Sequence, residues 1–231
     1  MEAAAVVVAA GAGARLGGPI PKQFLEVAGE PILLRAVRPF LEHPRVGAVV
    51  VVLPPLDAAR PPHFLAGLAI RIVAGGAERG DSVWNGLLAT PEQAERVLIH
   101  DGARPFVTAP VIDRVLDAAR RGGALAALPV TDTIKEVDTD GTVAATLERT
   151  RLWQAQTPQG FPRGEILAAY HRARQEGVAA TDDAALYERY VGPVKVVLGS
   201  ELNLKITRPL DLEVAAAVAA HLAGRVQFPP G

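Results

Sequence analysis

The chain has 231 residues, of which 49% are hydrophobic and 21% charged, and its 24 basic and 25 acidic side chains leave a net charge of −1. This composition excludes a largely disordered chain and predicts one folded domain, 1–231. It provides no overall field for nucleic acid or a membrane surface, so we expect neither partner, but a small anion held by local Arg and Lys. The absence of cysteine excludes disulfides and thiol chemistry and favours a reducing compartment, the cytoplasm.

Short apolar runs and amphipathic stretches alternate along the chain. The apolar runs predict buried strands at residues 6–8, 46–53, 70–73, 96–100, 124–130 and 194–198. The amphipathic stretches predict helices at residues 31–42, 56–68, 81–88, 110–121, 162–176, 182–190 and 208–222. The first apolar run is too short to span a membrane and follows no basic segment, so we interpret it as a strand. The alternation indicates the α/β class, with a Rossmann-like, mostly parallel sheet and helices on both faces.

The segment at about 131–153 interrupts this alternation. Its two halves, Thr133–Asp138 and Val143–Glu148, flank Asp140-Gly141, a dipeptide typical of short hairpin turns. A two-stranded ribbon is only marginally stable by itself, so either its own domain or a second subunit must cover it. We favour the second subunit, because the ribbon interrupts an otherwise complete α/β pattern.

A glycine loop, residues 9–15, follows the first predicted strand. Ligands of open α/β sheets bind at the carboxyl ends of strands, where glycines let backbone amides approach phosphate oxygens. Gly11 and Gly13 alone indicate only a turn that tolerates an anion. The cations Arg15 and Lys22 bracket the loop, and together they indicate a triphosphate site. The loop does not match a dinucleotide-binding motif, because the third glycine of that motif is missing. It does not match a Walker A loop either, because the Gly-Lys-Ser/Thr triplet is missing.

Two later segments also place polar groups at the ends of predicted strands. Residues 75–82 (GGAERGDS) form a glycine-rich turn that enters a helix, and we expect Asp81 or Ser82 to be its N-cap. Asp101 ends another strand, where its carboxylate could orient Mg²⁺, a cation that prefers oxygen ligands. A structural pair between Asp101 and Arg104 is the open alternative.

Two residues need both a structural and a functional interpretation. We expect His100 either to pack in the interior or to support a ligand-binding residue from behind, since no second histidine stands near it in the sequence. Lys205 lies between Leu204 and Ile206 on a predicted strand, and would point away from these apolar neighbours. It could therefore bind a ligand or simply face solvent.

In combination, residues 9–16, 21–25 (PKQFL) and 29–33 (GEPIL) resemble the nucleotidyltransferases that activate sugar and polyol phosphates. The Pro-Lys-Gln-Phe form is similar to the 2-C-methyl-D-erythritol 4-phosphate cytidylyltransferase family of the non-mevalonate isoprenoid pathway, over about residues 6–212. The resemblance implies a sheet of the nucleotide-diphospho-sugar transferase type. It also implies Mg²⁺-dependent transfer of CMP from CTP to 2-C-methyl-D-erythritol 4-phosphate, which yields 4-diphosphocytidyl-2-C-methyl-D-erythritol and pyrophosphate.

The resemblance assigns roles to individual side chains. Arg15 and Lys22 would stabilise charge at the α-phosphate, and Arg149 and Lys205 would align the acceptor phosphate. The nucleotide-binding residues would be Ala9, Ala10, Gly11, Ala12, Gly13, Gly75, Gly76, Ser82, Asp101, Gly102, Ala103 and Arg104. The acceptor-binding residues would be Thr133, Arg149, Thr157, Thr181 and Lys205.

The resemblance also implies a metal and a second subunit. Mg²⁺ would be bound mainly through the CTP phosphates, with Asp101 as its protein ligand. The protein would be a homodimer whose arm carries Arg149 to the neighbouring active site. An acceptor phosphate is already ionised at neutral pH, so catalysis would rest on positioning and charge stabilisation rather than on a general base. A cytidylyltransferase for ribitol 5-phosphate and a non-catalytic nucleotide-binding subunit are the alternatives.

Overall fold

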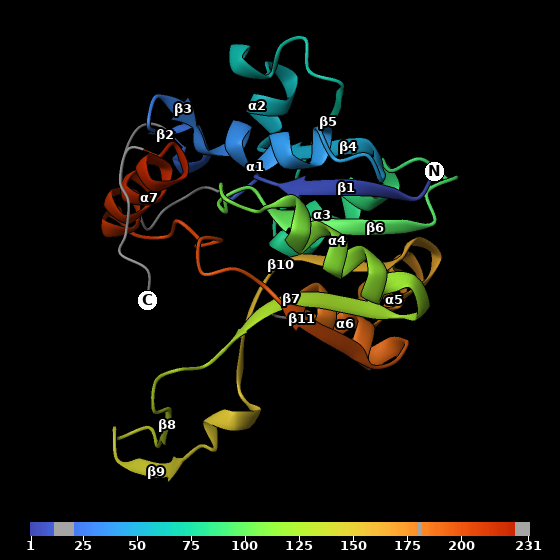
Figure 1. The fold of residues 1–231 in the computed structure, drawn as a ribbon. Helices are drawn as coiled ribbons and strands as arrows, with labels where there is room; N and C mark the ends of the chain where they lie inside the picture. Colours follow the sequence, from blue (N-terminus) through green and yellow to red (C-terminus); the bar gives the residue numbers. More distant parts are fainter. Residues whose placement is uncertain (12–20, 180–181, 225–231) are drawn as a thin grey trace.

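The computed structural model describes residues 1–11, 21–179 and 182–224. Its centre is a seven-stranded sheet in the order β11-β7-β10-β6-β1-β4-β5 (Figure 1). The strands are β1 (Ala3–Val8), β4 (Val46–Leu53), β5 (Ile70–Ala74), β6 (Arg96–Asp101), β7 (Gly123–Pro129), β10 (Trp153–Pro162) and β11 (Val194–Leu198). β10 pairs antiparallel with β6 and β7, and the other neighbouring pairs are parallel. The predicted mostly parallel sheet is therefore confirmed.

Helices cover both faces of this sheet, as Figure 1 shows. They are α1 (Ile32–Leu41), α2 (Pro55–Ala59), α3 (Arg79–Leu88), α4 (Ala109–Ala118), α5 (Arg163–Glu176) and α6 (Asp183–Tyr190), while α7 (Pro209–Leu222) lies apart from these faces. Successive residues of a strand point to opposite faces. Val7 of β1 accordingly belongs to the same buried cluster as Leu33 of α1. Val6 belongs to the other cluster, with Leu87 of α3 and Ile166 of α5. Burial on both faces explains why the strand is continuously apolar.

The sequence pattern does not predict β10, the strand between β6 and β7. This segment reads QAQTPQ near its middle and has no apolar run. Gln159 is buried, but its amide donates to Asp182 at 2.9 Å and accepts from the backbone of Ala184 at 2.9 Å. The amide of Gln156, also buried, donates to the carbonyl of Ser200 at 2.9 Å. Satisfied buried amides allow a polar sequence to occupy the interior.

The predicted helix at 56–68 is wrong in its length. The structure has the short helix α2, and then a single 3-10 turn, η3 (His63–Leu65). Pro61 and Pro62 stand between them, and proline disfavours helix both at its own position and at the residue before it. The apolar spacing across the prolines therefore belongs to two separate turns.

The predicted N-cap of α3 is also wrong. Glu78 is the N-cap, and its side chain forms a capping box with Asp81 at the third helical position. Ser82 lies one turn inside the helix. At the start of α6 the cap is Asp182, whose carboxylate accepts from the backbone of Ala185 at 2.9 Å. Both caps fix helix ends that face the carboxyl edge of the sheet.

The predicted hairpin is confirmed as β8 (Lys135–Val137) and β9 (Val143–Thr146), which pair antiparallel. Gly141 has a φ of 85° in the turn, a backbone conformation that favours glycine. Figure 1 shows this arm extending away from the body of the molecule beyond β7 and β10. Val137 and Val143 are more than half exposed on it, at 55% and 53%.

A smaller layer lies beside the carboxyl ends of β1 and β6. It contains the two-stranded sheet of β2 (Glu26–Val27) and β3 (Glu30–Pro31), and α7. Val27, Ile206 and Ala215 belong to one buried cluster in this layer. Among the described residues, no helix is both long enough and apolar enough to cross a bilayer.

Candidate active site

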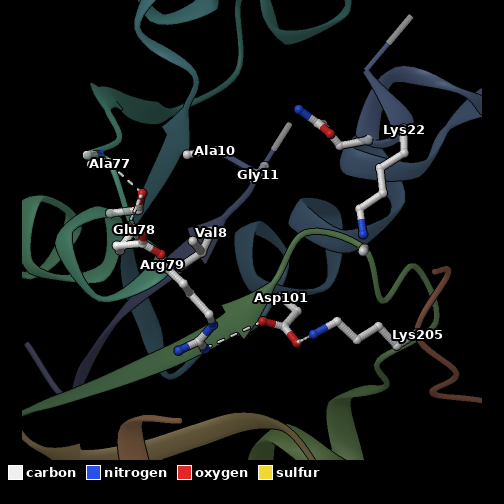
Figure 2. Close-up of a pocket in the computed structure, with 14 residues that line it drawn as sticks. Val8, Ala10, Gly11, Lys22, Ala77, Glu78, Arg79, Asp101 and Lys205 are labelled. Carbon is white, nitrogen blue, oxygen red and sulfur yellow. Dashed lines mark hydrogen bonds and ion pairs between the residues drawn. The ribbon is translucent and has the colours of Figure 1, made fainter. Parts of the chain in front are cut away.

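A cavity of about 320 Å³ opens at the carboxyl ends of β1 and β6 (Figure 2). Parallel strands end at the same edge, so the loops that follow them meet there. The lining residues are Val8, Ala9, Ala10, Gly11, Lys22, Gln23, Gly76, Ala77, Glu78, Arg79, Ser82, Asp101, Ala103 and Lys205. The cavity therefore unites the glycine loop, the turn before α3, the end of β6 and the segment before α7, as the sequence predicts.

Asp101 ends β6 and lies among three cationic side chains. Its carboxylate is 2.8 Å from Nζ of Lys205, 3.5 Å from Arg79 and 3.7 Å from Nε of Arg104. Figure 2 shows Lys205 on one side of Asp101 and Arg79 on the other. Burial alone would raise the pKa of Asp101, but the charges of Arg79 and Lys205 outweigh it and hold the pKa well below its usual range. Asp101 is therefore ionised at neutral pH.

Arg79 is a site residue that the sequence pattern does not single out. It is the first residue of α3, and its guanidinium donates to both carboxylate oxygens of Asp183, at 2.8 and 3.0 Å. Asp183 is fully buried and also accepts from the hydroxyl of Tyr170 at 2.5 Å. Burial would lower the pKa of Arg79, but the charge of Asp183 raises it above its ordinary value. The guanidinium is thereby fixed at the cavity wall.

Lys22 and Lys205 come from two segments that touch each other. Lys22 lies in the 3-10 turn η2 (Lys22–Phe24), and its Nζ donates to the carbonyl of Ile206 at 3.3 Å. The backbone of Ile206 in turn donates to the carbonyl of Ala103 at 2.9 Å. The structure has no strand at Lys205, so the predicted strand there is wrong. Lys205 is placed by these bonds at Ile206 and by its own ion pair with Asp101.

Glycines allow the turn before α3 to approach the end of β1. A Cβ on Gly75 would lie 2.3 Å from Cβ of Ala10 and 2.7 Å from Oγ of Ser82. A Cβ on Gly102 would lie 2.9 Å from Cβ of Ala9. Gly75 and Gly102 are not among the lining residues, so their contribution is close packing behind the cavity wall. Ser82 accepts from the backbone of Gly76 at 3.1 Å and so fixes the turn.

Thr157 and His100 support Asp101 from the interior. The hydroxyl of Thr157 accepts from the backbone of Asp101 at 3.0 Å and lies 3.0 Å from Nδ1 of His100. Nε2 of His100 lies 3.0 Å from the carbonyl of Arg104, so the neutral ring donates there and accepts from Thr157. Burial lowers the pKa of His100 to about 4, which keeps the ring neutral. The packing role predicted for His100 is confirmed, and Thr157 lies behind Asp101 rather than on the cavity wall.

Several predicted site residues lie elsewhere. Arg149 and Thr133 are exposed on the arm, where Arg149 donates to the carbonyl of Thr131 at 2.7 Å. Neither lines the cavity of its own chain. Arg104 donates to the carbonyl of Asn203 at 2.7 Å behind the wall. Outside the described residues lie Ala12, Gly13, Arg15 and Thr181.

The acidic residues of the cavity limit the kind of metal site it could form. Asp101 and Glu78 line it, and within the described ranges no three His, Asp or Glu side chains are grouped as a protein-only metal site would require. Mg²⁺ commonly takes one or two carboxylates and completes its coordination with substrate phosphates and water. An ionised Asp101 fits that kind of site.

Comparison with known proteins agrees with this geometry. A family model described as 2-C-methyl-D-erythritol 4-phosphate cytidylyltransferase (IspD) matches residues 3–221. The chain is 44% identical over 229 residues to the enzyme of that name from Syntrophus aciditrophicus, covering 96% of this chain and 97% of the relative. It is 45% identical over 211 residues to the one from Symbiobacterium thermophilum, covering 91% and 89%. The chain belongs to this family.

Solved structures of the cytidylyltransferase family have the same fold. The structure from Thermus thermophilus gives a TM-score of 0.81 at 37% identity and covers 95% of this chain and 99% of that one. The 4-diphosphocytidyl-2C-methyl-D-erythritol synthase from Anaerococcus prevotii gives 0.84 at 31% identity and covers 94% and 96%. The resemblance seen in the glycine loop and the Pro-Lys-Gln-Phe segment is thereby confirmed over most of the chain.

Proposed function

We propose that the chain transfers CMP from CTP to the phosphate of 2-C-methyl-D-erythritol 4-phosphate, giving 4-diphosphocytidyl-2-C-methyl-D-erythritol and pyrophosphate. The observation that carries the proposal is the meeting of Lys22, Lys205 and Asp101 in one cavity, in a member of the cytidylyltransferase family. Two ammonium groups in one cavity suit a reaction that brings two phosphorylated substrates together.

The chemistry is an in-line displacement at phosphorus. A phosphate oxygen of the acceptor forms a bond to the α-phosphorus of CTP, while the bond from that phosphorus to the β-phosphate oxygen breaks. The electron pair leaves with pyrophosphate. Since the attacking oxygen is already ionised at neutral pH, the step needs no strong general base, and positioning and charge stabilisation dominate.

Lys22 and Lys205 would bind different substrates, Lys22 the triphosphate and Lys205 the acceptor phosphate. Figure 2 shows the side chain of Lys22, from η2, on the same side of Asp101 as Lys205. Lys22 would neutralise charge on the triphosphate. Lys205 is half exposed at 38% and can exchange its contact with Asp101 for the acceptor phosphate. Arg79, fixed by Asp183, keeps Asp101 in place during that exchange.

Mg²⁺ fits the reaction through Asp101. An ionised carboxylate at the end of β6 would hold the cation together with the CTP phosphates. When bound, Mg²⁺ would neutralise charge on the departing pyrophosphate. Arg79 and Arg104 flank the carboxylate and would orient it toward the cation.

The arm supports a homodimer with shared active sites. Arg149 and Thr133 are exposed on the arm, which extends away from the body of the molecule (Figure 1), and neither lines the cavity of its own chain. Val137 and Trp153 expose apolar surface on and beside it, at 55% and 44%. A second copy of the chain would cover this surface, and its cavity would receive Arg149 as a ligand for the acceptor phosphate.

The test is pyrophosphate release with each of the four nucleoside triphosphates against a panel of polyol phosphates, with Mg²⁺ present. We expect activity with CTP and 2-C-methyl-D-erythritol 4-phosphate alone. A preference for ribitol 5-phosphate would reject the acceptor and keep the cytidylyltransferase. Tight CTP binding without turnover of any acceptor would instead identify a non-catalytic nucleotide-binding subunit.

A further inference from the structure

Gln23 carries a buried donor that nothing in the described part of the chain accepts. Its side chain is buried, at 2% exposure, yet its amide nitrogen Nε2 has no hydrogen-bond partner among the described residues. Folded proteins satisfy nearly all buried polar groups, because an unmade hydrogen bond in the interior is destabilising. A native donor in this position therefore points to an acceptor that the described part of the chain does not supply, such as a bound ligand.

The place of Gln23 indicates where that acceptor binds. Gln23 lines the same cavity as Lys22, its neighbour in η2. The turn is firmly built, since Phe24 donates to the carbonyl of Pro21 at 2.9 Å and Leu25 donates to that of Lys22 at 3.2 Å. The ring of Phe24 also packs edge-on against Phe64, with centroids 5.8 Å apart. The amide is thus carried by a hydrogen-bonded turn whose residues Lys22 and Gln23 line the cavity.

The chemistry of the cavity selects the kind of acceptor. Gln23 lies at the Lys22 end, and the Gly76–Ser82 turn lines another part of the wall. The ammonium of Lys22 and the amide nitrogen of Gln23 are both donors, which suits an anionic oxygen. Of the two carboxylates that line the cavity, Asp101 is already engaged by Lys205 and Arg79, and Glu78 caps α3.

We propose that Nε2 of Gln23 donates a hydrogen bond to a phosphate oxygen of the bound nucleoside triphosphate. This makes Gln23 a nucleotide-binding residue beside the cations, and it rests on the proposed function. Its contribution differs from that of Lys22, because a neutral donor orients the phosphate through the geometry of the hydrogen bond but does not neutralise its charge. The contact is made with the triphosphate and not with a nucleoside.

Two variants test the contact. Gln23→Met keeps the length of the side chain and removes the donor. Gln23→Glu keeps its shape and replaces the donor with a carboxylate that repels phosphate. Isothermal titration should show a Kd for CTP raised about tenfold or more by Gln23→Met, the effect of losing a hydrogen bond to a charged group, and further by Gln23→Glu. Binding of cytidine, measured by competition, should not change. Gln175→Met, at an exposed glutamine of α5, is the matched control and should bind CTP as the wild type does.

Thermal unfolding without nucleotide separates this contact from a structural role. If the acceptor is the nucleotide, Gln23→Met loses no bond in the protein alone, and its Tm stays the same or rises. A lower Tm in the absence of CTP would show that the amide bonds to the protein, and would overturn the proposal. Unchanged CTP affinity in both variants would overturn it too, while a wild type that does not bind CTP would reject the proposed function itself.

Discussion

Nζ of Lys205 lies 2.8 Å from Oδ2 of Asp101, so the segment before α7 is joined to the end of β6 by an ion pair inside the cavity. Arg79 approaches the other oxygen of Asp101 at 3.5 Å. The carboxylate of Asp101 therefore has a second cationic partner besides Lys205. Lys205 can exchange Asp101 for a phosphate without leaving an unpaired charge, which is the property that an acceptor-aligning lysine requires.

Replacing Lys205 by methionine tests this exchange. Lys205→Met should lower kcat by about 10²–10³, as is typical for the loss of one donor to the transition state. It should also raise KM for the polyol phosphate, because the acceptor loses its cation. The Kd for CTP should stay within about threefold, since Arg79 still holds Asp101. A variant whose CTP affinity falls as far as its kcat would show that Lys205 acts on the nucleotide.

Lys22 should act on the nucleotide. Lys22→Ala should lower kcat by about 10²–10³ in steady-state assays of pyrophosphate release at saturating CTP, because the charge that develops at the α-phosphate loses its cation. Lys195→Ala, at an exposed lysine of the edge strand β11, is the control and should be as active as the wild type. A loss of tenfold or less for Lys22→Ala would remove that residue from the transition state.

Much of the sheet was predictable because its strands are buried on both faces. β4 coincides with the predicted range 46–53, and residues 9–11, the described part of the glycine loop, follow β1 as predicted. β10 was not predictable by the same reasoning, since Gln156 and Gln159 are buried with their amides satisfied by Ser200 and Asp182. Those partners lie more than twenty residues away, and periodicity cannot reveal them.

The same limit applies to the site. Asp101 and Lys205 carry recognisable local motifs, and the structure places them in contact. Arg79 was missed because its importance comes from Asp183, over a hundred residues later in the chain. The sequence singles out Gln23 only as part of the Pro-Lys-Gln-Phe segment, since an unmet donor can be seen only once burial is known. Ion pairs and hydrogen bonds between distant segments depend on the fold, and they cannot be predicted from the local sequence around either residue.

Acid should destabilise the protein through His100. Burial lowers the folded pKa of this ring to about 4, whereas an unfolded histidine titrates near 6.5. As pH falls between these values, the unfolded chain takes up a proton that the folded chain does not. Stability is thus retained above about pH 6.5 and falls by about 1.4 kcal/mol per pH unit below it, or about 3 kcal/mol over the whole window.

Urea unfolding of the wild type and of His100→Gln between pH 7 and about 4.5 measures this effect, and that range stays above the titration of most carboxylates. The variant is expected to be less stable at every pH. However, its free energy of unfolding should change less steeply with pH, by about the 1.4 kcal/mol per pH unit that the uptake of one proton contributes. Equal slopes would mean that the folded protein accommodates a charged His100.

Two glycines of α3 form a matched pair for stability. A Cβ on Gly86 would lie 2.4 Å from Val6 and 2.9 Å from Val52, whereas a Cβ on Gly80 meets nothing within 4 Å. Gly86→Ala should therefore destabilise by about 1–3 kcal/mol through overpacking. Gly80→Ala should be neutral or stabilise by up to about 1 kcal/mol, because alanine favours helix. Urea midpoints of the two variants give the comparison, and a neutral Gly86→Ala would contradict the close seating of α3 on β1 and β4.

Mixed dimers decide whether active sites are shared between subunits. Arg149→Ala and Lys22→Ala should each inactivate their own homodimers. In a mixed dimer, the site with an intact Lys22 receives the intact Arg149 of the other chain, while the second site lacks both. Random mixing in equal amounts makes half of the dimers mixed with one working site each, so we expect recovery of about a quarter of wild-type activity.

The design of this experiment includes its own control. Mixing is confirmed by native mass spectrometry of chains with different tags, after unfolding and refolding them together. Lys22→Ala mixed with Lys205→Met should recover nothing, because both residues line the cavity of a single chain, and one substitution remains in each site. If the Arg149 mixture also recovers nothing although mixed dimers are present, each site is built from one chain. The arm would then have to fold back over its own cavity.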